Sequence, residues 1–478
     1  MVKIINKILF AAVFSCAIVS VNGCSEDITV GQTDESAYSE LNQLNIFLRD
    51  QQSGLAENTI DLGAAAYETT LYVGLSKTPY KGVDLKVEYD AEYLQSYNTA
   101  HESNLKLFPK ELLTLGNNGS IVVAPDEKTS FAIPLNVQAS AELEAGTYLL
   151  PLTITTSTDG INVSDNRCVY LVNKMNVQTC DKGEDAVKNF LFIEVNDVNP
   201  LNALEIVRED GKLFFDAVVI FAANINYNGS TGKVYVHQNP NVKFLLDHSD
   251  EFIQPLRRCG IKVLLGILGN HDAAGVCQLS ELGARLFAEE LKNLCNTYNL
   301  DGVNFDDEYS KNPDTSNPLF TGRSQAAGSR LLFETKKAMP DKMVTVYYLG
   351  QMLSTCPPVD GIEPGRFVDV AVEDYGKATA PMAGMSLKQC AGYSAKLDAY
   401  PAEVGSVEGS RQLAEKGYGW HMLYNLNPNY YFNKFNQFTY MQNSCKGFYD
   451  MDLKRPTHYY KKTGEGSFDA TRYPFEAQ

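Results

Sequence analysis

The sequence predicts two folded domains, an all-β sandwich followed by an α/β domain of the (β/α)8 barrel type. The chain has 478 residues, of which 44% are hydrophobic and 21% charged, so it can bury more than one core. Residues 58–180 alternate apolar and polar side chains in short runs. Residues 185–478 instead place apolar β-runs between longer helical or loop segments, which is typical of parallel strands with crossovers.

Residues 1–23 resemble a bacterial lipoprotein signal peptide. A basic start is followed by an apolar stretch and by a small-residue cleavage site before Cys24. The resemblance implies a lipid on Cys24, and the acidic residues 25–27 resemble a tag for export to the outer surface. We therefore expect an outer-membrane lipoprotein exposed at the cell surface and held to the membrane only by its lipid. The alternative is a plain secretory peptide with an incidental cysteine.

The segment 24–57 is predicted to be a lipidated tether that ends in a short helix around residues 41–47. The sandwich domain follows over 58–180. Its alternating runs span 68–75, 83–89, 129–135 and 146–154, with Gly, Pro, Asn and Asp between them. No chemically active side chains converge there, so this domain is either a spacer or an accessory binding module.

Eight β-runs predict the barrel over 185–478. They cover 190–195, 217–222, 263–268, 302–308, 344–349, 367–372, a poorly defined run at 400–404, and 419–423. Helical periodicity is clear over 279–298 and 330–338 but weak after the sixth and seventh runs. We expect the outer ring of helices to be incomplete there.

Chemistry in such barrels lies at the carboxyl ends of the strands. The predicted strand ends carry a set of polar and aromatic residues: Glu194, Asn196, Asn224, Asn226, Asn270, His271, Asp306, Glu308, Tyr347, Tyr348, Glu373, Tyr375, Glu403, Tyr424 and Asn425. We therefore expect these side chains to converge on one rim of the barrel.

The stretch 300–309 carries the strongest signal of a site. Because strand side chains alternate, Asn304, Asp306 and Glu308 share one face, while Val303 and Phe305 take the other. Burying a row of polar groups without hydrogen-bond partners would cost several kcal/mol, so a fold that buries them is expected to use them. This pattern predicts an active site, the alternatives being an acidic surface turn or a calcium loop.

The net charge and the cysteine spacing limit the kinds of ligand that the protein is expected to bind. A formal net charge of −17 argues against nucleic acid, which needs a basic face, and is compatible with a neutral glycan. The ten cysteines include no Cys-x-x-Cys pair, so a structural zinc site is not expected. Their pairing as disulfides stays open. We expect a monomer without metal or cofactor.

The run 301–308 resembles the Asp-x-x-Asp-x-Asp-x-Glu signature of glycoside hydrolase family 18, more narrowly of endoglycosidase H and its relatives. Six other stretches agree with that subgroup: 192–196, 215–227, 260–265, 268–271, 417–419 and 424–426. The similarity covers roughly 188–428. The sandwich is similar to domains that precede such barrels in bacterial surface endoglycosidases.

The resemblance implies an endo-β-N-acetylglucosaminidase that cleaves the β-1,4 bond of the N,N'-diacetylchitobiose core of N-linked glycans with retention of configuration. It implies that Glu308 is the general acid and then the base. The acetamido oxygen of the substrate would be the nucleophile, and Asp306 would orient the acetamido group and stabilise the positive charge. High-mannose or hybrid chains are the implied substrates, although the loops 309–322 and 350–366 leave this open.

Further residues are expected to bind substrate. Tyr347, Tyr348 and Tyr375 are candidates for the acetamido carbonyl, and Tyr424 for the floor beneath the reacting sugar. His271 either holds a loop or touches sugar. The full predicted set is Asn304, Glu194, Asn224, Asn226, Asn270, His271, Tyr347, Tyr348, Glu373, Tyr375, Tyr424 and Asn425.

Asn304 departs from the family pattern, which has aspartate at this position. We expect Asn304 to donate a hydrogen bond to Asp306, to help it stay ionised by removing a like charge, and to alter the pH profile. Two other readings remain: a non-catalytic glycan-binding lipoprotein, and a chitinase. Chitinases line long clefts with tryptophans, and this chain has only Trp420.

Overall fold

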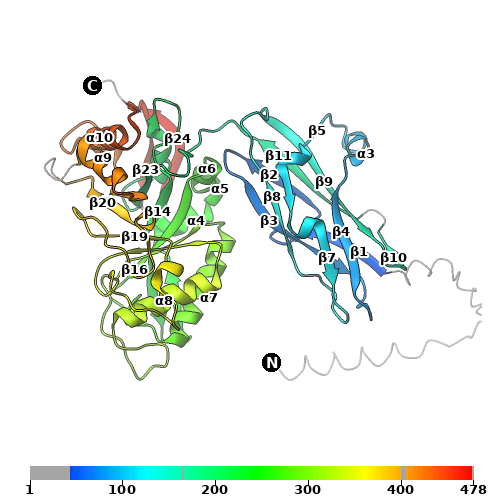
Figure 1. Cartoon of the computed structure of the whole chain (residues 1–478), viewed down its shortest axis with the longest axis horizontal. Helices are drawn as coiled ribbons and strands as arrows, with labels where there is room; N and C mark the ends of the chain where they lie inside the picture. The colour runs from blue at the N-terminus through cyan, green and yellow to red at the C-terminus, as the bar shows by residue number, and fades with distance from the viewer. Residues whose placement is uncertain (1–43, 164–165, 400–404, 476–478) are drawn as a thin grey trace, which may run out of the picture.

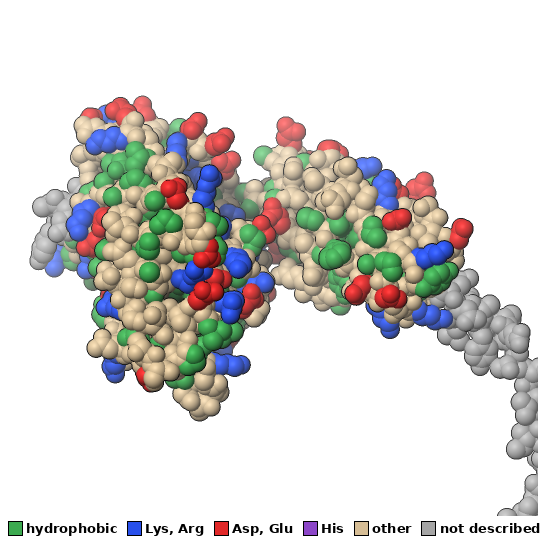
Figure 2. Space-filling view, turned by 60° about the horizontal axis from the view of Figure 1, so that its bottom comes forward, with side chains coloured by type: hydrophobic (Ala, Val, Ile, Leu, Met, Phe, Trp, Pro, Cys, Tyr) green, Lys and Arg blue, Asp and Glu red, His purple; other side chains and the backbone are tan. Residues whose placement is uncertain are grey.

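The computed structural model describes residues 44–163, 166–399 and 405–475. The predicted signal peptide, Cys24 and most of the predicted tether lie outside the described residues. Figure 1 shows two separate bodies, the sandwich in blue to cyan and the barrel in green to red. Within the described ranges, no helix combines the length and the apolar character needed to cross a bilayer. On the face in Figure 2, acidic and basic side chains are interspersed over both domains.

Two facing sheets form the N-terminal domain. One has the order β10-β1-β3-β8-β6 and the other β2-β11-β9-β4-β7, with β5 beside β9. The strands are β1 (Leu44–Asp50), β2 (Glu57–Leu62), β3 (Tyr67–Leu75), β4 (Val83–Tyr89), β5 (Lys106–Leu107), β6 (Leu113–Leu115), β7 (Ser120–Val123), β8 (Ile133–Val137), β9 (Gly146–Thr156), β10 (Ile161–Asn162) and β11 (Arg167–Lys174). Most neighbours are antiparallel, but β2 runs parallel to β11.

The helix expected around residues 41–47 is wrong for its described part. Residues Leu44–Asp50 form β1, which pairs antiparallel with β3 and begins the sandwich before residue 58. Ile46 and Leu48 are fully buried on the same face, as alternation in a strand requires. Over so short a segment, the apolar spacing fits a helix and a strand equally well, and pairing with β3 decides between them.

Eight parallel strands form the second domain, and the predicted fold class is confirmed. They are β12 (Lys188–Glu194), β14 (Ala217–Asn228), β16 (Lys262–Gly269), β17 (Gly302–Phe305), β18 (Met343–Tyr347), β19 (Val370–Val372), β20 (Ala391–Lys396) and β21 (Trp420–Tyr424). Each pairs with the next in the order β19-β18-β17-β16-β14-β12-β21-β20. A parallel bridge between Ala371 and Cys390 joins the two ends and closes the ring.

The seventh strand is not where the sequence suggested. The predicted run at 400–404 lies outside the described residues, and β20 at Ala391–Lys396 occupies the seventh place. Its sequence, Ala-Gly-Tyr-Ser-Ala-Lys, has no β-branched residue and few large apolar ones. Propensity therefore gives no strand signal there, although pairing with β21 forms one.

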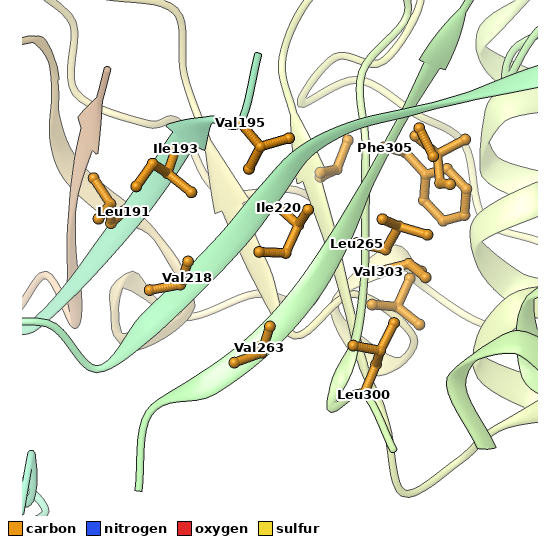
Figure 3. Close-up of a cluster of buried hydrophobic side chains, with 14 of the residues drawn as sticks. Leu191, Ile193, Val195, Val218, Ile220, Val263, Leu265, Leu300, Val303 and Phe305 are labelled. Atoms are coloured by element: carbon orange, nitrogen blue, oxygen red, sulfur yellow. The ribbon is translucent and has the colours of Figure 1, made fainter. Parts of the chain in front are cut away.

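Side chains of the barrel strands alternate between two cores. Phe190, Phe192 and Val219 point to the barrel interior with Leu264 and Met422. The residues between them point outward and pack under the helices. Figure 3 shows part of this outer layer, which includes Leu191, Ile193, Val218, Ile220, Val263, Leu265, Val303 and Phe305.

The outer ring is irregular. Helices α4 (Pro240–Asp247), α5 (Ser249–Phe252), α6 (Gln254–Arg258), α7 (Glu281–Thr297), α8 (Gln325–Ala338), α9 (Val407–Glu415) and α10 (Gln437–Tyr449) follow β14 to β17, β20 and β21. In the described chain only the short 3-10 turns η4 (Pro364–Arg366) and η5 (Leu387–Gln389) follow β18 and β19. The expected gap after the sixth strand is present, whereas the seventh strand is followed by α9.

A C-terminal hairpin packs where the first helix would lie. Between β12 and β14 the chain forms only the 3-10 helix η3 (Pro200–Glu205) and the short β13 (Val207–Arg208). The hairpin of β23 (His458–Gly464) and β24 (Ser467–Pro474) packs against η3 and α4. The buried Asn199 and Asn202 donate to the backbone oxygens of Lys461, Asp469 and Tyr460. These bonds replace the missing helix with a polar seam.

In the described part of the chain, neither a disulfide nor a metal site links segments of the fold. The eight cysteines from Cys168 to Cys445 are free and buried. Among the described residues, no cluster of three or more His, Cys, Asp or Glu side chains has the arrangement of a metal site.

Candidate active site

A cleft of about 480 Å³ opens at the carboxyl ends of the barrel strands. It is lined by Phe192, Glu194, Asn196, Phe221, Ala222, Asn224, Asn239, Leu268, Asp306, Glu308, Tyr309, Tyr347, Leu349, Asp374, Tyr375, Lys396, Met422 and Tyr424. Acidic, amide and tyrosine side chains predominate in this set. A cavity of this kind can hold a sugar by stacking and by hydrogen bonds.

A larger cleft of about 760 Å³ lies at the other end of the barrel, beside the sandwich. Its main ionic groups are already paired with each other. Arg257 makes a bidentate contact with Asp301, at 2.7 and 3.1 Å, and Arg258 contacts Asp61 of the sandwich at 3.1 Å. We assign the chemistry to the smaller cleft, because the unpaired carboxyl groups lie there.

The backbone fixes where Asp306 and Glu308 emerge. The Asp306 N–H donates to Ile267 O at 3.0 Å, and the Glu308 carbonyl accepts from Gly269 N at 3.1 Å. A Cβ at Gly269 would lie 2.3 Å from the Glu308 carbonyl oxygen, so glycine is needed for this approach. The strand end β17 is therefore bound to the end of β16, with both carboxyl groups facing the cleft.

Of the two carboxyl groups, that of Asp306 is the one buried without sufficient hydrogen-bond partners. It is only 4% exposed, and its Oδ1 has no hydrogen-bond partner. Burial, and then the neighbouring charges of Glu308, Asp307 and Asp374, raise the pKa of Asp306 well above its usual range. These surroundings therefore make the ionised form of Asp306 less favourable than that of a free carboxyl group.

Asn304 lies beneath Asp306, on the same inward face, and is fully buried. It does not reach the cleft, and the expected hydrogen bond to Asp306 is wrong. Its amide nitrogen donates instead to Thr345 Oγ1 on the neighbouring strand β18, at 2.9 Å. The absence of a charge at position 304 does not keep the pKa of Asp306 low, because burial dominates.

Three tyrosines form a wall of the cleft. The ring of Tyr375 lies 6.0 Å from that of Tyr347 and 5.7 Å from that of Tyr424. The Tyr347 hydroxyl donates to Asp374 Oδ1 at 2.6 Å, and the Tyr424 hydroxyl donates to Glu194 Oε2 at 3.4 Å. These bonds hold the rings in place around the space above Asp306.

The two carboxyl groups behind this wall differ in ionisation. Burial raises the pKa of Glu194. Burial acts in the same direction on Asp374, but hydrogen bonds from the Tyr347 hydroxyl and the Tyr375 N–H and the charge of Lys377 outweigh it and lower the pKa of Asp374. Asp374 is therefore the stable anion of the cleft.

The structure brings together eight of the residues expected at the strand ends: Glu194, Asn196, Asn224, Asp306, Glu308, Tyr347, Tyr375 and Tyr424. The others do not line the cleft. Tyr348 points to the outer core and donates to Ala380 O at 3.0 Å, since it lies one residue out of phase with Tyr347. Glu373 is likewise one residue out of phase with Asp374, and Asn425 is bound to Asp398.

Asn226, Asn270 and His271 lie on the extensions of β14 and β16, away from the cleft lining. Asn270 donates to Asn226 Oδ1 at 3.2 Å, so the two amides satisfy each other. The backbone N–H of His271 donates to Tyr309 O at 2.7 Å. The His271 ring lies 5.6 Å from the ring of Tyr309, so the side chain is next to the start of the loop 309–322, and its role stays a prediction. Glu403 lies outside the described residues.

Sequence reasoning missed four cleft residues with polar side chains, Tyr309, Asn239, Asp374 and Lys396. Asp374 could have been found by extending the alternation of β19, because the even positions Val370 and Val372 point inward. Lys396 ends β20, the strand that was misplaced. Asn239 is the N-cap of α4, accepting from Asn241 N and Val242 N, and its local signal is that of a cap.

Known proteins with a similar sequence share this barrel. Endo-β-N-acetylglucosaminidase F1 from Elizabethkingia meningoseptica is 43% identical over 247 residues, which cover 51% of this chain and 72% of the relative. The chain belongs to the endo-β-N-acetylglucosaminidase family. An endo-β-N-acetylglucosaminidase from Flavobacterium sp. (strain SK1022) is 32% identical over 238 residues, covering 49% of this chain and 74% of that protein.

Solved structures extend the similarity to both domains. The crystal structure of Bacteroides thetaiotamicron EndoBT-3987 with Man5GlcNAc product is 42% identical, covers 90% of this chain and 99% of its own, and superposes with a TM-score of 0.60. The same enzyme with Man9GlcNAc2Asn substrate gives 39% identity and a TM-score of 0.59, with the same coverage. A family model for an N-terminal domain matches residues 26–161. The predicted activity, an endo-β-N-acetylglucosaminidase, is confirmed.

Replacing Asp306 with asparagine should stabilise the fold at neutral pH. Because the pKa of Asp306 is raised in the folded state, wild type loses stability as pH rises above the unfolded value of about 3.9. Asp306→Asn should therefore be more stable than wild type at pH 7, with no gain near pH 3.5. Urea unfolding at both pH values measures this.

The exposed Asp314 provides the control, since Asp314→Asn should give no gain at pH 7. Equal stability of wild type and Asp306→Asn at neutral pH would show that the Asp306 carboxyl group is not held at a cost.

Proposed function

We propose that Glu308 and Asp306 cleave the β-1,4 bond of the N,N'-diacetylchitobiose core of N-linked glycans by substrate-assisted, retaining hydrolysis. The proposal rests on one observation, the place in the chain from which the two carboxyl groups enter the cleft. They leave the same end of one strand, separated by one residue, and face the same cleft.

Two carboxyl groups from one strand end do not suit the usual retaining mechanism. Alternate residues of a strand are about 6.6 Å apart on the same side. Ordinary retaining enzymes instead place two carboxyl groups on opposite sides of the bond, one as acid and one as nucleophile. With both groups on one side, the nucleophile has to come from elsewhere, and the acetamido oxygen of the substrate is suitably placed in any N-acetylglucosamine.

Glu308 is the group that moves the proton. It is half-buried, whereas Asp306 and Asp307 on either side are buried, so Glu308 is the carboxyl group of this run that reaches an incoming sugar. As general acid it protonates the leaving oxygen, and as base it then takes a proton from water. The Tyr309 hydroxyl forms a hydrogen bond with the Glu308 carboxylate, which raises the pKa of Tyr309.

Asp306 responds to the charge that forms on the substrate. In the free cleft its ionised form is unfavourable, for the reasons given above. A positive charge on the oxazolinium ring beside it offsets that cost, so the interaction is stronger in the transition state than in the ground state. Within the tyrosine wall, the Tyr375 hydroxyl is the donor for the acetamido carbonyl, because the hydroxyl groups of Tyr347 and Tyr424 already donate to Asp374 and Glu194.

High-mannose glycans are the proposed substrates. EndoBT-3987, which is similar over both domains, has been crystallised with Man9GlcNAc2Asn and with Man5GlcNAc. The cleft of this chain is lined mainly by neutral polar groups, carboxyl groups and aromatic rings, a composition that suits neutral sugars.

The chain would act as a lipid-anchored enzyme at the outer surface of a bacterial cell. The sequence around Cys24 supports this proposal, since it has the order of basic, apolar and small residues found in lipoprotein signals. In that arrangement the sandwich would hold the barrel away from the membrane.

Replacing Glu308 with glutamine tests the proton-transfer role. Glu308→Gln should lower turnover on a high-mannose glycoprotein by about 10²- to 10⁴-fold, the range for a lost general acid, while glycan binding persists. Mass spectrometry of released glycans and calorimetric binding measure the two effects. The exposed Glu289→Gln on α7 should behave as wild type. Near-normal turnover by Glu308→Gln would refute the assignment.

Replacing Asn304 with aspartate tests how its neutrality affects catalysis. A carboxylate beneath Asp306 adds a buried like charge and should raise the pKa of Asp306 further. Because Asp306 acts in its ionised form, the acidic limb of the kcat/KM profile should move to higher pH. Asn304→Ser, which adds no charge, should leave the limb in place. Superimposable profiles of Asn304→Asp and wild type would contradict the hypothesis.

Replacing Cys24 with serine tests the anchor. Wild type expressed in a bacterial host should fractionate with membranes and be removed from intact cells by added protease, and Cys24→Ser should lose both properties. Cys16→Ser, a change within the predicted signal peptide, is the matched control. Membrane fractionation of Cys24→Ser equal to wild type would exclude a lipid on this residue.

A further inference from the structure

Asp307 separates the two carboxyl groups of the cleft and points away from it. Its side chain is completely buried. A single oxygen, Oδ2, accepts three hydrogen bonds: from Gln351 N at 2.7 Å, from Arg323 Nη2 at 2.8 Å and from Arg323 Nε at 3.1 Å. Arg323 Nη2 also donates to the backbone carbonyl of Asp307 at 3.1 Å. The guanidinium therefore holds both the side chain and the main chain of this residue.

The partners of Asp307 come from two other segments. Arg323 follows the loop 309–322 and immediately precedes Ser324, the N-cap of α8. Gln351 lies at the start of the loop 350–366, after β18. At Gly350, which has φ +60°, a Cβ would lie 2.4 Å from Asp307 Oδ2. Only glycine allows the second loop to approach the carboxylate so closely.

Both tied segments border the cleft. Tyr309 begins the first loop and Leu349 precedes the second, and both line the cavity. The carboxylate of Asp307 thus connects the strand end that carries Asp306 and Glu308 with two loops that border the cleft. Cutting this connection would free all three parts with respect to each other.

We propose that Asp307 and Arg323 are a positioning pair for catalysis, which fixes the orientation of Asp306 and Glu308 and the seating of both cleft loops. Consecutive side chains of an extended chain point to opposite sides, so fixing Asp307 on the outside fixes its two neighbours on the inside. The proposal rests on the roles assigned above to Asp306 and Glu308.

Arginine is suited to this role because its planar fork fixes direction as well as charge. Lysine would keep the charge but lose the paired contact through Nε and Nη2. A displacement of about 1 Å at the reacting groups can lower the rate by about 10²-fold, so a residue outside the cleft can have a large effect on turnover.

The test replaces Arg323 with alanine in the full chain and measures release of a high-mannose glycan. Arg323→Ala should lower kcat by about 10- to 100-fold with little change in KM, since the groups that bind sugar remain. Added guanidinium ion should restore part of kcat in a saturable way. Arg323→Lys should lie between alanine and wild type.

Arg411 on α9 provides a control in another part of the barrel. It contacts Glu408 of the same helix at 3.0 Å, and neither residue belongs to the cleft lining or to the two cleft loops. Arg411→Ala should change kcat less than about twofold and should not respond to guanidinium.

The outcomes separate the proposals. A folded Arg323→Ala with kcat near that of wild type, or with a loss that guanidinium does not restore, overturns the positioning pair. If Arg323→Ala fails to fold, Arg323→Lys decides: a threefold or larger fall in kcat at unchanged melting temperature supports the pair, and an unchanged kcat overturns it. The roles of Asp306 and Glu308 are judged separately, by Glu308→Gln.

Discussion

The burial of Val303 and Phe305 beneath the outer helices is the constraint on which the active site depends. Both are fully buried in the outer core, and the pairing of β17 with β16 and β18 fixes their register. A slip by one residue would turn them into the barrel interior and place Asn304 and Asp306 in the outer apolar core, which the cost of burying polar groups without partners opposes. The core thus decides that Asn304, Asp306 and Glu308 face the barrel interior and its cleft.

The same constraint explains why Asp306 is held at a cost. A carboxyl group with an unpartnered oxygen, surrounded by other acids, is a poor contributor to folding and would be removed if stability alone mattered. The two large hydrophobic layers of the barrel provide the stability that offsets it. Asp307, which points to the outside, also has one oxygen without a partner, Oδ1, but its other oxygen, Oδ2, accepts three hydrogen bonds, two of them from Arg323. One buried carboxyl group is therefore kept poised for chemistry, and its neighbour is used for rigidity.

Local alternation and length were enough to predict the barrel, the pair Asp306 and Glu308, and six further cleft residues. What could not be predicted depends on tertiary contacts. Strand β20 forms from small and polar residues because β21 pairs with it, and β1 forms in place of a helix because β3 does. The choice of Asp374 over Glu373, and of Tyr347 over Tyr348, depends on strand phase at a strand end. The hydrogen-bond partner of Asn304 is Thr345 of the neighbouring strand, which the sequence of β17 does not reveal.

The central claim is that the substrate, and no residue of the enzyme, supplies the nucleophile. The most direct measurement is the turnover of a glycan whose cleaved sugar carries a hydroxyl in place of the 2-acetamido group. The account predicts that this analogue binds but is hydrolysed at least about 10³-fold more slowly, because the well-placed internal nucleophile is gone. Hydrolysis at a rate near that of the natural glycan, with a covalent glycosyl-enzyme intermediate, would contradict the account.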